Sequence, residues 1–118
     1  NRGMMSYLEI VKKVNDQMIL DGKGKFEVVD VKSVQNGLEV YGVRCGKTTY
    51  VYVYNATSTK MPVQFQNMDM NKTKGNLELL DTNLKKYSTE KFSISSEKVL
   101  TIDNVLIAPK QEFIIQIK

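Results

Sequence analysis

The 118-residue sequence contains no histidine. Histidine is the commonest general base and the commonest metal ligand, and it activates the nucleophile in Ser-His and Cys-His pairs. Its absence excludes those catalytic arrangements. The acidic residues stand singly along the chain, so their spacing brings no two carboxylates together as an acid and a base. We therefore expect this chain to carry no catalytic residue, no metal ion and no cofactor.

Cysteine and long apolar runs are also scarce. The single cysteine, Cys45, excludes an intrachain disulfide, which is compatible with the cytosol and with a secreted protein that needs no cross-link. The apolar runs are short, so we expect no membrane span. The sequence begins with Asn1 rather than Met, which suggests a piece of a longer precursor whose missing start would hold any targeting signal. A secreted or cell-envelope location is favoured over a cytoplasmic one.

Basic residues are not concentrated in any part of the sequence. Seventeen basic and 13 acidic residues give a formal net charge of +4, and the adjacent basic pairs are Lys12-Lys13 and Lys85-Lys86. Proteins that bind nucleic acid usually gather their positive charge in one patch or stripe. The sequence therefore predicts a solvated surface of mixed charge and no nucleic-acid partner.

The clearest pattern in the sequence is the alternation in residues 48–55, which read TTYVYVYN. Side chains on one face of this segment are Tyr50, Tyr52 and Tyr54. Valines occupy the other face, and such alternation predicts a strand in the centre of a sheet. The tyrosines either pack in the core with their hydroxyls at an edge or form a platform for sugar rings or bases. Flanking valines and the absence of tryptophan favour packing, and the three tyrosines are the candidate binding residues.

Residues 6–20 are predicted to form an amphipathic helix. Ser6 can cap its start, and Glu9 completes a capping box. The apolar stripe of this helix consists of Tyr7, Val11, Val14 and Met18. Because a helix of this length is marginal alone, the stripe must pack either on the chain's own sheet or on another domain. We predict the second case, in which the stripe is a domain interface and leaves an apolar patch exposed when the chain is isolated.

Residues 25–118 are predicted to form an antiparallel β-sandwich of about eight short strands, preceded by the helix of residues 6–20. Strands spaced by roughly 8–12 residues are typical of a sandwich or barrel, and the length of the chain suits one domain, 1–118. Asn36-Gly37 predicts a tight hairpin, since a type I′ turn needs two positive φ angles. Gly42 is a candidate β-bulge, and Cys45-Gly46-Lys47 is predicted to turn into the tyrosine strand.

Two short segments match the N-glycosylation sequence. They are Asn55-Ala56-Thr57 and Asn71-Lys72-Thr73. This motif is frequent by chance and matters only in a secreted eukaryotic protein.

The order of the predicted elements resembles the end of many glycoside hydrolases with a TIM-barrel catalytic domain, such as β-galactosidases, agarases and amylases. Residues 6–17 (SYLEIVKKVNDQ) look like the last barrel helix, and 50–57 (YVYVYNAT) with 63–65 are similar to strands of the C-terminal β-sandwich. Residues 105–117 (VLIAPKQEFIIQI) resemble its terminal hairpin. The resemblance implies a non-catalytic accessory domain, since the catalytic carboxylates of those families lie on the barrel.

Two main hypotheses follow for the function. In the first, the chain is a C-terminal accessory β-sandwich of a larger carbohydrate-active enzyme, whose partner is the catalytic domain of the same polypeptide. In the second, it is a free-standing module that binds carbohydrate or protein at a cell surface. A small β-barrel that binds nucleic acid is a third and weaker hypothesis. The upstream reading frame distinguishes the first two, because only the accessory domain requires a preceding βα-alternating region.

Overall fold

The computed structural model describes residues 8–9, 12–13, 16, 27–68, 70 and 72–118. Within these residues the chain is mainly β, as predicted. The strands are β1 (Glu27–Val29), β2 (Lys32–Ser33), β3 (Leu38–Cys45), β4 (Thr48–Asn55), β5 (Met61–Gln66), β6 (Lys74–Leu80), β7 (Lys86–Ile94), β8 (Leu100–Ile107) and β9 (Glu112–Ile117). All described pairings are antiparallel, and the nine strands form one sheet in the order β1-β3-β4-β9-β6-β7-β8-β5-β2.

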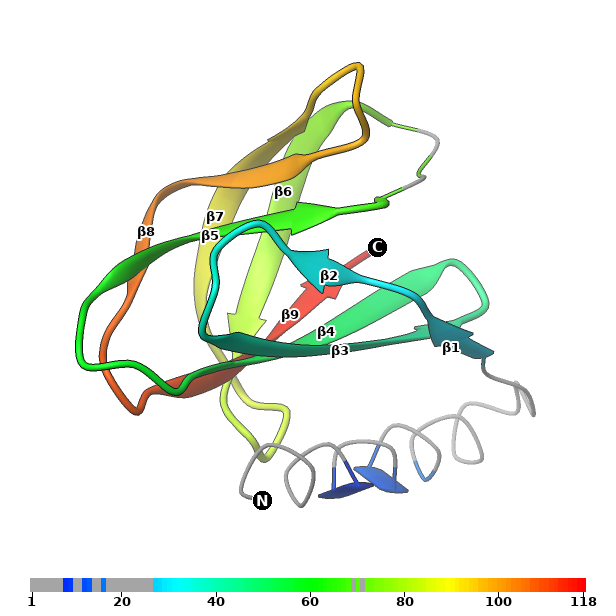
Figure 1. The fold of residues 1–118 in the computed structure, drawn as a ribbon. Coiled ribbons are helices and arrows are strands. Elements are labelled where there is room, and N and C mark those ends of the chain that lie inside the picture. Colours follow the sequence, from blue (N-terminus) through cyan, green and yellow to red (C-terminus); the bar gives the residue numbers. More distant parts are fainter. Residues whose placement is uncertain (1–7, 10–11, 14–15, 17–26, 69, 71) are drawn as a thin grey trace.

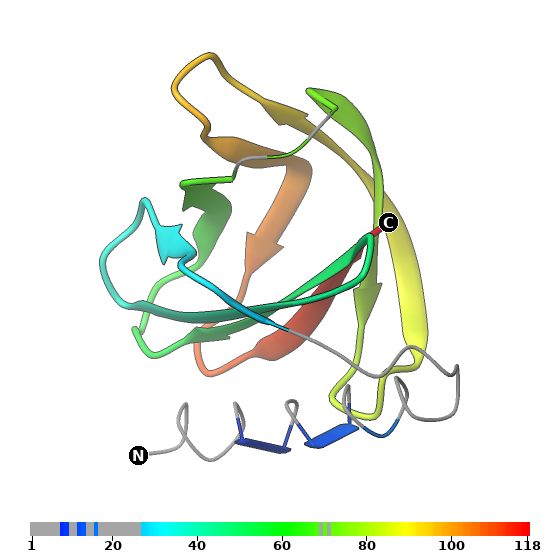
Figure 2. The same cartoon turned by 90° about the vertical axis from the view of Figure 1, so that its right-hand side faces the viewer.

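The sheet curls into a half-barrel rather than dividing into the two packed sheets of the predicted sandwich (Figures 1 and 2). Its outermost strands, β1 and β2, lie at opposite edges, although only Asp30 and Val31 separate them in the sequence. The two edges must therefore lie near each other. Alternation identifies the apolar face of a strand but not the neighbours to which the strand is hydrogen-bonded, which is why the sequence predicted a mainly β chain but not the arrangement of its strands.

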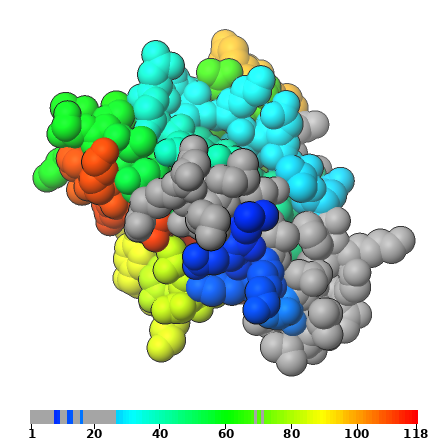
Figure 3. Space-filling model, turned by 60° about the horizontal axis from the view of Figure 1, so that its bottom comes forward, coloured from blue at the N-terminus to red at the C-terminus, as the bar shows by residue number. Residues whose placement is uncertain are grey.

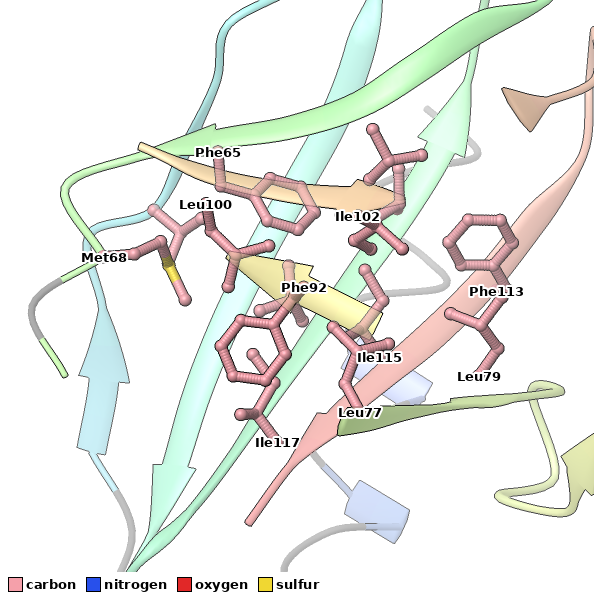
Figure 4. Close-up of a cluster of buried hydrophobic side chains, with 14 of the residues drawn as sticks. Phe65, Met68, Leu77, Leu79, Phe92, Leu100, Ile102, Phe113, Ile115 and Ile117 are labelled. Carbon is pink, nitrogen blue, oxygen red and sulfur yellow. The ribbon is translucent and has the colours of Figure 1, made fainter. Parts of the chain in front are cut away.

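The interior of the half-barrel is a single apolar core (Figure 4). Its side chains come from both halves of the sheet and include Phe65 of β5, Phe92 of β7 and Phe113 of β9. The valines of β4 also point into this core and are fully buried. Apolar burial of this kind stabilises a fold by about 25 cal/mol per Å², so the half-barrel contains its own source of stability.

The predicted hairpin at Asn36-Gly37 is wrong. The strand before it, β2, pairs with β5, and the strand after it, β3, pairs with β4 and β1. Gly37 has the positive φ, 94°, that the turn prediction required, whereas Asn36 is not among the described residues with positive φ. The dipeptide therefore reverses the chain between strands that are not paired with each other.

Gly42 is not a β-bulge. Its register with Val51 of β4 and with Val29 of β1 continues without a shift. A Cβ atom at this position would lie 3.0 Å from Val31 Cγ2, in the segment that joins β1 to β2. A side chain here would press on that segment, which crosses closely over β3, so glycine fits this position without displacing Val31. The predicted turn of residues 45–47 is confirmed for Gly46 and Lys47, which join β3 to β4, whereas Cys45 is the last residue of β3. Gly46 has a φ of 60°.

Asn55 ends β4 and joins three segments of the chain through its side chain. Its Nδ2 donates to Thr59 O at 2.8 Å and to Ile107 O at 3.0 Å. Its Oδ1 accepts from Thr57 N at 2.9 Å and from Thr57 Oγ1 at 2.7 Å. The residue is fully buried, so the sequon that contains it is not an exposed glycosylation acceptor, and its amide instead satisfies buried backbone groups.

Candidate interaction surface

The tyrosines of β4 lie on the outer side of the half-barrel, opposite the interior core. Here a second group of apolar side chains gathers over β3, β4, β9 and β6 and the loops beside them. This group, the aromatic face, consists of Tyr41, Val43, Cys45, Tyr50, Tyr52, Tyr54, Ala56, Leu80, Leu84 and Ile114. Alternation explains the division, because successive side chains of a strand point to opposite sides of the sheet.

All three candidate binding tyrosines are buried. Tyr52 is 0% exposed, and Tyr50 and Tyr54 are 8% and 7% exposed. The Tyr52 hydroxyl donates to Glu112 Oε2 at 2.8 Å, and Gln116 Nε2 donates to the Tyr50 hydroxyl at 3.0 Å. The Tyr52 ring also stacks on Tyr41, with 6.2 Å between the ring centroids. This geometry favours packing with the hydroxyls at polar partners, and sugar binding by the stripe remains a prediction.

Two glutamates flank Tyr54 within the aromatic face. In the register of the sheet, Tyr54 lies opposite Glu39 on β3 and opposite Glu112 on β9. Glu39 Oε1 is buried and has no hydrogen-bond partner among the described residues. A buried oxygen without a donor lowers stability. Sequence reasoning did not identify Glu39, since only the register places it beside the tyrosines.

The candidate domain-interface residues Tyr7, Val11, Val14 and Met18 lie outside the described residues. The N-terminal segment is described at five positions, and one of them, Lys13, contacts the turn between β6 and β7. Its Nζ donates to Thr82 O, and it donates to Asn83 Oδ1 at 3.2 Å. Figure 3 shows the described N-terminal residues, in blue, beside the yellow-green turn between β6 and β7. This part of the chain therefore reaches the edge of the aromatic face.

The turn between β6 and β7 is built around Asp81. Its Oδ1 accepts from Asn83 N at 2.8 Å and from Lys85 N at 3.0 Å, and its backbone N–H donates to Lys85 O. These bonds hold Leu84 at a φ of 65°, a left-handed conformation that a leucine rarely adopts. Leu84 in turn packs against the aromatic face. The Asp81 carboxylate therefore positions one apolar side chain of this surface.

Acidification is expected to loosen this turn. The backbone N–H of Lys85 stabilises the ionised carboxylate and is the main cause that lowers the pKa of Asp81 below its ordinary value of 3.8. Because the pKa of Asp81 is lower in the folded protein than in the unfolded chain, its ionised carboxylate stabilises the fold at pH values above the unfolded pKa. This stabilisation is lost as the pH falls through the folded pKa. A carboxyl NMR titration should show Asp81 ionising below 3.8. In an Asp81→Asn variant, the free energy of unfolding should decrease less on acidification than in the unmodified protein. An equal decrease in both proteins would contradict the role of Asp81.

Neither a metal centre nor a membrane helix is found in the part of the chain that the structure describes. There, no group of three or more His, Cys, Asp or Glu side chains could hold a metal ion. Among the same residues, no helix has the length and apolar composition needed to cross a membrane.

The fold resembles segments of glycoside hydrolases. No protein-family model matches the sequence, and no curated protein matches it significantly. A GH30 endoxylanase from Clostridium papyrosolvens matches with a TM-score of 0.56 and 10% identity, over 88% of this chain and 26% of that one. A rhamnosidase from Novosphingobium sp. PP1Y matches with a TM-score of 0.48 and 14% identity, over 87% and 9%. The first likeness establishes a shared fold, and this chain spans only about a quarter of the endoxylanase.

Proposed function

We propose that this chain is a non-catalytic, C-terminal accessory β-domain of a larger carbohydrate-active enzyme, which packs against and stabilises the catalytic domain. The observation that carries the proposal is the endoxylanase match, in which nearly the whole half-barrel corresponds to about a quarter of a longer hydrolase. At 10% identity the match supports the fold alone. The accessory role is inferred from the small share of the enzyme that such a fold occupies.

The partly exposed rim of the aromatic face supports the proposal as the docking surface, because the central tyrosines, Tyr50, Tyr52 and Tyr54, are already buried within this chain. Tyr41 belongs to this rim, and Glu39 lies beside it with a half-buried side chain. Tyrosine is enriched at interfaces because one end of its side chain is apolar and the other is polar. A catalytic domain that presented an N–H donor or a cation at this rim would compensate the charge of the Glu39 carboxylate.

A free-standing binding module is the second candidate. The interior core supports it, because the half-barrel buries its own apolar side chains without a further domain. The reading frame that precedes Asn1 separates the two candidates. The accessory domain requires several hundred upstream residues with alternating strand and helix patterns. A short upstream reading frame that encodes only a signal peptide would support the binding module instead.

A charge reversal in the aromatic face tests the docking directly. In the longer enzyme, Glu39→Lys is expected to lower the free energy of unfolding by about 1–3 kcal/mol, because a partner donor then meets a cation. In the isolated 118-residue chain, the loss should be within about 1 kcal/mol, since Glu39 Oε1 has no described partner. Scanning calorimetry of both proteins measures the difference.

Glu97→Lys is the matched control, because it reverses the same charge at an exposed position in the turn between β7 and β8. It should have little effect in either protein. An equal loss for Glu39→Lys in the isolated chain and in the longer enzyme would contradict docking through the aromatic face.

A further inference from the structure

A hollow of about 400 Å³ lies where β3 turns into β4 and β9 ends. The described residues that line it are Arg44, Gly46, Lys47, Thr49, Met70, Lys72 and Lys118. They come from the β3–β4 hairpin, the connection between β5 and β6, and the residue after β9. In Figure 1 the end of β9 and the turn between β3 and β4 both lie toward the right of the view, at the same end of these strands. The fold therefore gathers cations that are far apart in the sequence, and we call this feature the basic hollow.

Arg44 is the best-positioned cation of the basic hollow. It lies between Glu27 and Thr49 in the register of the sheet. Its Nε donates to Thr49 Oγ1 at 3.3 Å, and its Nη1 lies 3.7 Å from Glu27 Oε1. These two contacts orient the guanidinium, while its five N–H donors leave capacity for a bidentate carboxylate. Its side chain is 33% exposed, so a ligand can reach it.

The charges of the described lining residues favour an anion in the basic hollow. Four cationic side chains line it, against one lining carboxylate, the α-carboxylate of Lys118 at the end of the 118-residue chain. The neighbouring carboxylate of Glu27 is 69% exposed, so solvent weakens its compensation of Arg44. Like charges around a concave surface raise the local potential and attract anions. The volume lies within the range of about 300–1,000 Å³ for small-molecule sites.

We propose that the basic hollow binds the carboxylate of an acidic saccharide, such as a uronic acid unit of a polysaccharide. The anionic part of the proposal rests on the four cations, and the saccharide part rests on the proposed role in a carbohydrate-active enzyme. Arg44 would bind the carboxylate through its planar fork, while the lysines would supply additional positive charge. Met70 provides an apolar contact for a ring carbon face.

The probe is trigalacturonic acid, titrated into the 118-residue chain and followed by amide NMR and calorimetry. The expected result is binding with shifts confined to residues around the basic hollow, weakening as salt is raised. The methyl ester of the same trimer has nearly the same shape without the charge and should bind at least about tenfold more weakly. Equal affinity for the acid and the ester would overturn the proposal.

Paired substitutions provide a matched test. Lys47 and Lys72 are exposed, so Lys47→Gln with Lys72→Gln should preserve the fold. Removing two charges from the site should weaken trigalacturonate binding about fivefold to tenfold. The control is Lys60→Gln with Lys91→Gln, which removes the same charge from exposed positions outside the described lining. Equal weakening by both pairs would overturn the site, since it would show a response to net charge alone.

Inorganic phosphate separates a saccharide site from a general anion site. Phosphate should bind more weakly than the trimer, and equal or tighter binding of phosphate would overturn the saccharide part of the proposal. This titration needs no catalytic domain, whereas the docking test compares the chain with the longer enzyme. If trigalacturonate binds but Glu39→Lys shows no docking, the accessory role is rejected and the basic hollow is retained as a binding site. If docking is found but trigalacturonate does not bind, the basic hollow is rejected and the accessory role is retained.

Discussion

Asn55→Asp is expected to lower the free energy of unfolding by about 2–5 kcal/mol at neutral pH, because two carbonyl oxygens lose their donor and face a buried carboxylate, which the hydrogen bonds from Thr57 to Oδ1 compensate only in part. The substitution keeps the shape of the side chain but replaces the amide that donates to Thr59 O and Ile107 O. Two carbonyl oxygens would then face a carboxylate in a fully buried site. Denaturant unfolding measures the loss, which would consume much of the roughly 5–15 kcal/mol that typically stabilises a domain.

The pH dependence of this loss gives an independent check. Burial beside carbonyl oxygens raises the folded pKa of the introduced carboxyl, so the penalty should shrink in acid and grow as the pH rises above the unfolded value. Asn76→Asp makes the same chemical change at an exposed position of β6 and should alter stability little. Equal effects of the two substitutions would contradict the role assigned to the Asn55 amide.

Tyr52→Ala is expected to cost about 3–5 kcal/mol, as other truncations of large buried aromatic side chains do. The ring is 0% exposed, stacks on Tyr41 and occupies the middle of the aromatic face. Its removal therefore leaves a cavity and separates the side chains of β3 and β9 that pack on it. The midpoint of denaturant unfolding should fall accordingly, with an unchanged slope.

Two further variants separate the contributions of the Tyr52 ring. Tyr52→Phe keeps the ring and removes the hydroxyl that donates to Glu112 Oε2, so about 1 kcal/mol should be lost. Tyr87→Ala truncates a tyrosine that is 51% exposed on β7 and should have an effect within about 0.5 kcal/mol. An unchanged midpoint for Tyr52→Ala would show that the ring does not stabilise the fold, and a sugar titration of the tyrosine stripe would then be required.

The surface that carries the proposed function could be predicted only in part. Alternation in 48–55 correctly placed the tyrosines of β4 on one face and the valines on the other. It could not place Glu39 beside Tyr54, because that neighbourhood depends on the pairing of β3 with β4. The sequon at Asn55 carried no information on burial, whereas in the structure this amide is fully buried and donates to the carbonyl oxygens of Thr59 and Ile107. Side-chain type indicates capacity for hydrogen bonds, and only packing decides the partners.

The basic hollow shows the same limit for charge. Arg44, Lys47, Lys72 and Lys118 form no cluster in the sequence, and the even spread of basic residues predicted a surface of mixed charge. The pairing of the start of β4 with the end of β9 brings the hairpin beside the last residue of the chain. Local charge counts do not include such contacts, because the segments are joined by the sheet rather than by the chain.

The sequence by itself determined the mainly β class of the chain and the two faces of its clearest strands, because alternation acts over a few neighbouring positions. In β9, for example, Phe113, Ile115 and Ile117 alternate with Ile114 and lie on the opposite face from it. Only the tertiary structure decided that β9 lies between β4 and β6, that β1 and β2 separate to opposite edges, and that one curled sheet replaces a sandwich. Backbone hydrogen bonds between strands are largely independent of side-chain identity, so the choice of partners depends on how the whole chain buries its core.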